Sequence, residues 1–66
     1  MKALTGRELC RLLETRGWVL HRLSGSDHIY KHVERGRVIS VPVHAGRTLK
    51  AGLQGALLKA AGIEPE

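Results

Sequence analysis

Several residue types are scarce in this chain of 66 residues, and each shortage excludes a class of protein. Its single cysteine, Cys10, rules out an intramolecular disulfide and lies among leucines in a helical pattern, which predicts a small core residue. Trp18 and Tyr30 are its two aromatic residues, too few for the base-stacking sheet that some single-strand RNA-binding proteins use. No apolar run reaches membrane-spanning length and no charged-then-apolar leader opens the chain, so we expect a soluble, cytoplasmic protein.

Acidic residues are also few. Six Asp and Glu stand against eleven Lys and Arg, which gives a net charge of +5 and a pI of about 10.2. Seven of the cations are arginine, the residue best suited to bidentate contact with phosphate or carboxylate. We therefore expect nucleic acid as the partner, with basicity for solubility alone as the alternative.

The length allows one domain, residues 1–66, with a small core. A domain of this size buries only about 60% of the surface of its unfolded chain, so a deep metabolite pocket is not expected. Surface chemistry on a large partner fits the length better.

Residues 4–17 predict an amphipathic helix. Thr5 and Glu8 have the spacing of a capping box, and Gly17 is a suitable stop. Charged residues fall off the apolar stripe and are expected in water. The stripe consists of Leu9, Leu12 and Leu13.

Three strands are expected next, at 18–23, 28–33 and 37–43, with the turns "SGSD" and "ERGR" between them. Simple alternation groups Val19 with His21 and Leu23 on one face of the first strand, opposite Trp18, Leu20 and Arg22. Both faces carry apolar residues, so the pattern does not decide which is buried. In the third strand the apolar face holds Ile39, Val41 and Val43.

A second helix is predicted over 51–62, with a buried stripe of Leu53, Leu57 and Ala60 or Ala61, followed by a tail at 63–66. The element order α-β-β-β-α predicts an α+β fold. Its three-stranded antiparallel sheet would have two helices on one face, because a small sheet needs one face covered. The double-stranded-RNA-binding domain has this arrangement, and that analogy concerns the fold only.

Four histidines are the main candidates for chemistry: His21, His28, His32 and His44. His28 and His32 are four residues apart, which on a strand is roughly 13 Å and too far for two ligands of one zinc ion. We therefore expect no metal or other cofactor.

Acid–base catalysis on RNA suits histidine better. RNA carries its own nucleophile, the 2′-hydroxyl, and a base and an acid suffice to break the chain near neutral pH. His28 stands where a turn meets a strand, beside backbone N–H groups of Gly25 and Ser26 that could meet an anion. We expect His21 to be a packing or cross-strand residue and His32 to be solvated, and His44 either touches RNA or has no role. The cations available for phosphate are Arg22, Lys31, Arg47 and Lys50.

Four segments carry a family resemblance: "GW" at 17–18, "RLSGSDHIYKH" at 22–32, "ISVPVH" at 39–44 and "LKAGLQGALLKAAGI" at 49–63. Together they resemble the HicA toxins of bacterial toxin–antitoxin systems, over residues 4–63. The resemblance implies a double-stranded-RNA-binding-like fold and a ribosome-independent mRNA endoribonuclease that stops translation. It also implies a HicB antitoxin that covers the active site, and it leaves self-association open.

One departure concerns the catalytic position. In the family, Gly-Ser is followed by the catalytic histidine and often by a second histidine. Here Gly25 and Ser26 match, Asp27 takes the catalytic position and His28 takes the second. Three alternatives follow: His28 acts, after a shift of the turn or a bulge; Asp27 acts as base with another group as acid; or the protein binds RNA and cleaves it poorly. We favour the first two.

The second helix also differs from the family pattern, with Ala51 and Leu53 where the family has proline and threonine, while Lys50 and Gly52 are kept.

The rival function is a non-catalytic RNA- or protein-binding module, and a structural adaptor is the third alternative. RNA affinity without cleavage would favour the binding module, and no RNA affinity would favour the adaptor.

Overall fold

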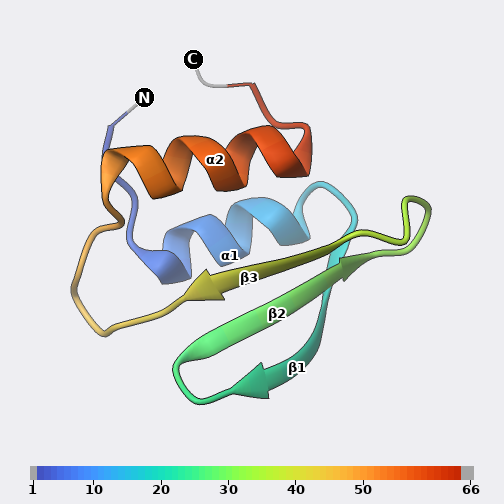
Figure 1. Cartoon of the computed structure of the whole chain (residues 1–66), viewed down its shortest axis with the longest axis horizontal. Coiled ribbons are helices and arrows are strands. Elements are labelled where there is room, and N and C mark those ends of the chain that lie inside the picture. Colours follow the sequence, from blue (N-terminus) through green and yellow to red (C-terminus); the bar gives the residue numbers. More distant parts are fainter. Residues whose placement is uncertain (1, 65–66) are drawn as a thin grey trace.

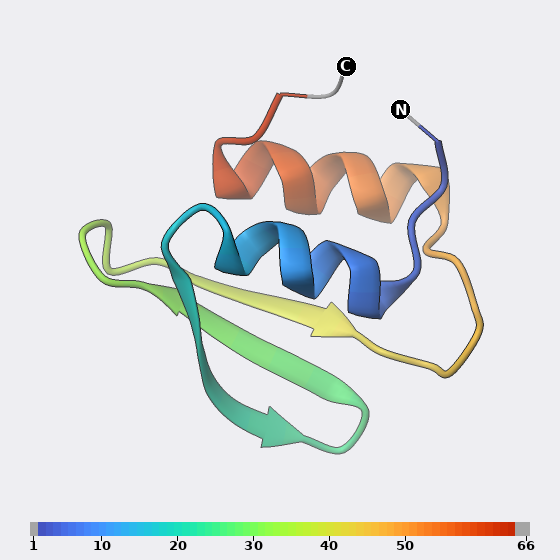
Figure 2. The same ribbon diagram turned by 180° about the vertical axis from the view of Figure 1, so that it is seen from behind.

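The computed structural model describes residues 2–64 and contains two helices and three strands. The elements are α1 (Gly6–Glu14), β1 (Trp18–Ser24), β2 (Asp27–His32), β3 (Val38–Pro42) and α2 (Ala51–Ala61). The strands form an antiparallel sheet in the order β1-β2-β3, and both helices cover the same face (Figures 1 and 2). The predicted α+β architecture is confirmed. Neither helix of the described residues has the length and apolar character needed to span a membrane.

Helix α1 begins at the predicted capping box. The backbone N–H of Glu8 donates to Thr5 Oγ1 at 3.1 Å, and the Thr5 N–H donates to Glu8 Oε1 at 2.9 Å. The hydrogen bond from the Thr5 backbone holds the pKa of Glu8 below its ordinary value. Leu9 and Leu13 are fully buried on the inner side of the helix.

Strands β1 and β2 form a hairpin with a two-residue turn. Ser24 pairs with Asp27, so Gly25 and Ser26 make the turn. Gly25 has a φ of 60° and Ser26 does not have a positive φ. A positive φ at the first central residue alone is the type II′ pattern, which glycine adopts without steric strain.

A bulge at His21 corrects the predicted faces of β1. The register shifts between Leu20 and Arg22, so Leu20 pairs with Tyr30 and Leu23 pairs with His28. Because of the extra residue, Leu23 lies on the same side as Leu20 and not with Val19. His21 itself is exposed and has no paired residue on β2, so its prediction as a packing or cross-strand residue is wrong.

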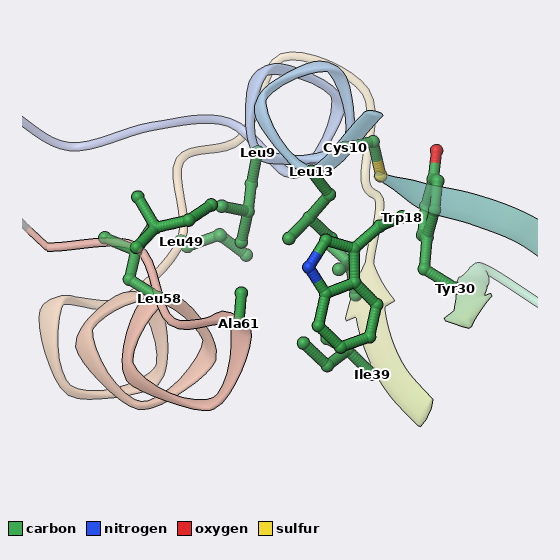
Figure 3. Close-up of a cluster of buried hydrophobic side chains, with 11 residues drawn as sticks. Leu9, Cys10, Leu13, Trp18, Tyr30, Ile39, Leu49, Leu58 and Ala61 are labelled. Atoms are coloured by element: carbon green, nitrogen blue, oxygen red, sulfur yellow. The ribbon is translucent and has the colours of Figure 1, made fainter. Parts of the chain in front are cut away.

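The core lies between the helices and the inner face of the sheet (Figure 3). Trp18 and Tyr30 are its two aromatic members, 1% and 2% exposed. Ile39 and Val41 of β3 face inward as predicted. The remaining buried apolar residues are Leu9, Cys10, Leu13, Leu49, Leu58, Ala61 and Ile63.

Helix α2 buries only part of the predicted stripe. Ala61 is buried, and Leu57 and Ala60 are partly buried against the core, whereas Leu53 is 40% exposed. Gln54 and Leu58 are buried and were not predicted. The Gln54 amide accepts a hydrogen bond from the Leu4 N–H at 2.7 Å and donates to the Lys2 carbonyl at 3.0 Å, so this polar group is satisfied inside the fold. Of the predicted tail, Ile63 is buried, and Pro65 and Glu66 lie outside the described residues.

Candidate active site

The two residues at the start of β2 face opposite sides of the sheet. His28 lies on the helix-covered side with Tyr30 and His32, because side chains alternate along a strand. Asp27 lies on the open side with Lys31. The pairs Ser24–Asp27 and Leu23–His28 follow directly on the turn, so the bulge occurs at His21 and not at the turn. Asp27 and His28 therefore do not face a common ligand across the sheet.

His28 lines a small hollow between α1 and the sheet, of about 260 Å³. Arg7, Arg11 and Glu14 of α1 form its charged wall, and His28 lines it from β2. The other lining residues are Cys10, Leu20, Tyr30 and Val43. Two cations, a carboxylate and an imidazole thus surround a space large enough for a phosphate group.

One nitrogen of His28 has no protein partner. Among residues 2–64, the buried side-chain nitrogen and oxygen atoms without a hydrogen bond are Trp18 Nε1 and His28 Nδ1. Trp18 lies in the apolar core, whereas His28 is half-buried at the hollow. Buried polar atoms are usually paired, so a buried imidazole nitrogen without a partner is unusual and singles out His28 as a candidate for function.

Tyr30 and Cys10 are unsuited to acid–base work. Burial and the hydrogen bond that the Tyr30 hydroxyl donates to Glu14 Oε2, at 2.7 Å, raise the pKa of Tyr30. Burial likewise raises the pKa of the Cys10 thiol, which keeps it protonated and poorly nucleophilic. Tyr30 acts instead as a hydrogen-bond donor that holds the Glu14 carboxylate.

His32 has a structural role, and its prediction as a solvated residue is wrong. It is 9% exposed, and its ring meets that of Trp18 edge-on with centroids 5.1 Å apart. Its Nδ1 accepts from the N–H groups of Glu34 at 3.1 Å and Arg35 at 3.3 Å. With Nδ1 an acceptor, Nε2 is the donor to the Arg16 carbonyl at 3.1 Å. All of its polar capacity is used inside the fold.

The predicted RNA-binding residues fall into two groups. Gly25 and Ser26 form the exposed turn next to His28, and Ser26 O accepts from the Val43 N–H at 2.9 Å. That bond brings the turn beside the end of β3, where the exposed loop containing His44, Arg47 and Lys50 begins. Arg22 and Lys31 are exposed on the open face of the sheet, away from His28.

Arg7, Arg11 and Glu14 are exposed, as predicted for the charged residues of this helix, but the sequence did not predict that they line a hollow with His28. The spacing of Arg7 and Arg11, one helical turn apart, was the available signal. Such pairs usually belong to a solvated face, and only the packing of α1 against the sheet places them opposite His28.

Other hollows lie elsewhere on the surface, and one of about 600 Å³ is lined by His21, Lys31, Glu34 and Arg35 among others. A larger hollow, of about 640 Å³, lies between α2 and both ends of the described chain and is mostly apolar. Its Gln54 amide is already hydrogen-bonded. Within residues 2–64, no three histidine, cysteine or acidic side chains are grouped so that they could hold a metal ion.

Comparison with known proteins identifies the family of the chain. A family model described as "HicA toxin of bacterial toxin-antitoxin" matches residues 6–63, which include all five elements. No curated protein matches the chain.

Proposed function

The chain belongs to the HicA toxin family of bacterial toxin–antitoxin systems, and from this premise we propose that it is an endoribonuclease that cleaves mRNA without a metal. The observation that carries the proposal is His28: a half-buried imidazole with an unpartnered nitrogen, at a hollow flanked by two arginines. Cleavage of mRNA would inhibit translation and account for toxicity.

In the proposed reaction His28 acts on the ribose beside the phosphate. It takes the proton of the 2′-hydroxyl, the 2′-oxygen attacks phosphorus, and the bond from phosphorus to the 5′-oxygen breaks. The proton then passes from the imidazole to the departing 5′-oxygen. The products are a 2′,3′-cyclic phosphate and a 5′-hydroxyl end, and the step consumes no cofactor.

The RNA would approach the end of the sheet at which the β1–β2 turn lies. Gly25 and Ser26 offer their backbone there, and the exposed side chains of the following loop supply His44, Arg47 and Lys50. Arg22 and Lys31 lie on the other face, so we assign them to flanking phosphates. Substitution of Arg22 or Lys31 should weaken RNA binding and leave the cleavage rate of the bound RNA unchanged.

A HicB-type antitoxin is the proposed protein partner. The net charge of +5 favours an acidic partner, and a protein covering the hollow would keep RNA from His28. The antitoxin and RNA would then compete for one surface, and the toxin would act when free.

The second candidate is an RNA-binding module that does not cleave. The observation in its favour is Asp27, which stands where the family carries its catalytic histidine and faces the open side of the sheet. In that case salt-sensitive RNA binding would occur without strand breakage.

A cleavage assay separates the two candidates. The purified toxin is incubated with mRNA and excess EDTA, and RNA integrity is followed on a denaturing gel alongside growth after induction in cells. We expect cleavage that EDTA does not prevent, abolished in His28→Ala and kept in Asp27→Ala. Intact RNA with measurable binding would favour the module, and loss in Asp27→Ala alone would move the catalytic role to Asp27.

A further inference from the structure

We propose that Arg7 and Arg11 of α1 form a phosphate-binding site for the RNA linkage that is cleaved. This inference rests on the proposed nuclease function and names the groups that would hold its substrate. Both arginines line the same hollow as His28, and both are exposed to an incoming strand. Their guanidinium groups can each give two parallel hydrogen bonds to phosphate oxygens.

The two side chains lie on one face of α1. Residues four apart on a helix have Cβ atoms only about 5–6 Å from each other, so Arg7 and Arg11 can reach a single phosphate together. Cys10 and Val43 of the same hollow are buried or half-buried apolar residues. A phosphate held there would be partly shielded from water, which strengthens its attraction to both cations.

Gly6 explains why α1 lies so close to the sheet. A Cβ at this position would lie 2.3 Å from the Pro42 carbonyl oxygen and 3.0 Å from Val43 Cα. The first turn of α1 therefore rests directly on the end of β3 (Figure 2). Val41 of that strand pairs with His28, so Arg7, the residue after Gly6, lies at the His28 end of the hollow.

Glu14 marks the opposite end. Its carboxylate is held by the Tyr30 hydroxyl at 2.7 Å, two residues along β2 from His28. Going along α1, the hollow thus runs from the arginines beside His28 to the carboxylate beside Tyr30. A phosphate is attracted to the first end and repelled by the second, which directs it toward His28.

Other arginines do not line this hollow. Arg35 donates to the Ala61 carbonyl at 3.4 Å and Arg37 donates to the Ala60 carbonyl at 3.5 Å, at the end of α2. Arg16 follows α1 and is exposed, but it does not line the hollow of His28. It provides a matched control with the same charge near the same helix.

The test compares Arg7→Gln and Arg11→Gln with Arg16→Gln in steady-state cleavage of a fluorescent single-stranded oligoribonucleotide. We expect kcat/KM to fall about 10-fold or more in the first two, because each loses a donor to the transition-state phosphate. Arg16→Gln should stay within about twofold, because Arg16 does not line the hollow and would give no hydrogen bond to that phosphate.

A second readout does not depend on cleavage. RNA affinity of His28→Ala protein, alone and combined with each arginine substitution, is measured against salt concentration. Loss of one phosphate contact should lower the slope of log affinity against log salt by about 0.7 for a single strand. Arg16→Gln should leave that slope unchanged.

These measurements separate failure of the proposed phosphate site from failure of the proposed nuclease function. If Arg7→Gln and Arg11→Gln behave like Arg16→Gln while His28→Ala abolishes cleavage, the phosphate site is wrong and the nuclease function stands. If the wild-type protein does not cleave RNA, the nuclease function is wrong. The salt slopes alone then decide whether Arg7 and Arg11 bind phosphate.

Discussion

The two ends of β2 carry a histidine each, on the same face of the same strand, and the protein uses them in opposite ways. His32 is packed against Trp18 and has hydrogen bonds at both ring nitrogens. His28 has a buried nitrogen with no partner and borders a hollow with two arginines. The surrounding contacts, and not the residue type or its strand position, separate the histidine that packs inside the fold from the one that we propose to be reactive.

The difference follows from what lies over each end of the strand. At His32 the chain closes tightly, with the Arg16 carbonyl on one side and the backbone after β2 on the other. At His28 the ring is half-buried and borders the hollow between the first turns of α1 and the sheet, next to the exposed hairpin turn. We therefore expect activity and stability to respond separately at the two positions.

The largest expected effect is on cleavage in His28→Ala. The cleavage rate should fall about 10²–10⁴-fold, the usual contribution of a general acid–base group. The free energy of unfolding should change by no more than about 1 kcal/mol, because Nδ1 gives no hydrogen bond to lose. Cleavage rates and urea unfolding of the same preparations measure both, and a large stability loss would contradict the comparison.

His32→Ala should show the reverse. We expect a loss of about 2–4 kcal/mol in the free energy of unfolding, because the change removes a packed ring and leaves buried backbone groups unpaired. The folded fraction should still cleave RNA. His21→Ala, at the exposed bulge, is the control and should stay within about 0.5 kcal/mol. Equal stability of the two variants would show that His32 does not stabilise the fold.

Gly6→Ala should disturb the His28 end through the backbone. Its Cβ would collide with the Pro42 carbonyl, so we expect a loss of about 1–3 kcal/mol and slower cleavage as α1 moves away. Gly55→Ala is the matched control, since nothing lies within 4 Å of its Cβ in the middle of α2. It should stabilise the protein by about 0.5–1 kcal/mol. Thermal unfolding and cleavage rates measure both effects. Similar changes in the two variants would contradict the prediction.

The smallest effect concerns the cap that starts α1. The pKa of Glu8 is lowered from its ordinary value of 4.5 by the Thr5 backbone, so its stabilisation is present above that value. It is lost as the pH falls through the lowered pKa of the folded state. Wild type should exceed Glu8→Gln in stability near neutral pH, and the gap should close in acid. Urea unfolding at several pH values checks this, and a gap that persists in strong acid would contradict it.

Local signals in the sequence predicted much of the fold. The capping box at Thr5 and Glu8, the glycine turn at Gly25 and the β-branched third strand depend on near neighbours, so their structures could be predicted without knowing the tertiary fold. The family resemblance predicted from the sequence is confirmed by the HicA family model, which matches residues 6–63.

Errors arose where distant groups decide the outcome. The bulge at His21 depends on how β1 fits over β2, and it moved Leu23 to the helix side. The burial of Gln54 in α2 depends on its amide, which pairs with Leu4 and Lys2 some fifty residues away in the chain. No periodicity in the helix itself carries that information.

The sequence by itself determined the order of the elements, the basic charge and the presence of a Gly-Ser turn followed by Asp27 and His28. Strand alternation required those two side chains to face opposite sides. The tertiary structure decided which side meets α1, and so which residue shares a hollow with Arg7 and Arg11. The physical reason is that packing of a helix against a sheet joins residues far apart in the chain, and reactivity at this site depends on those neighbours.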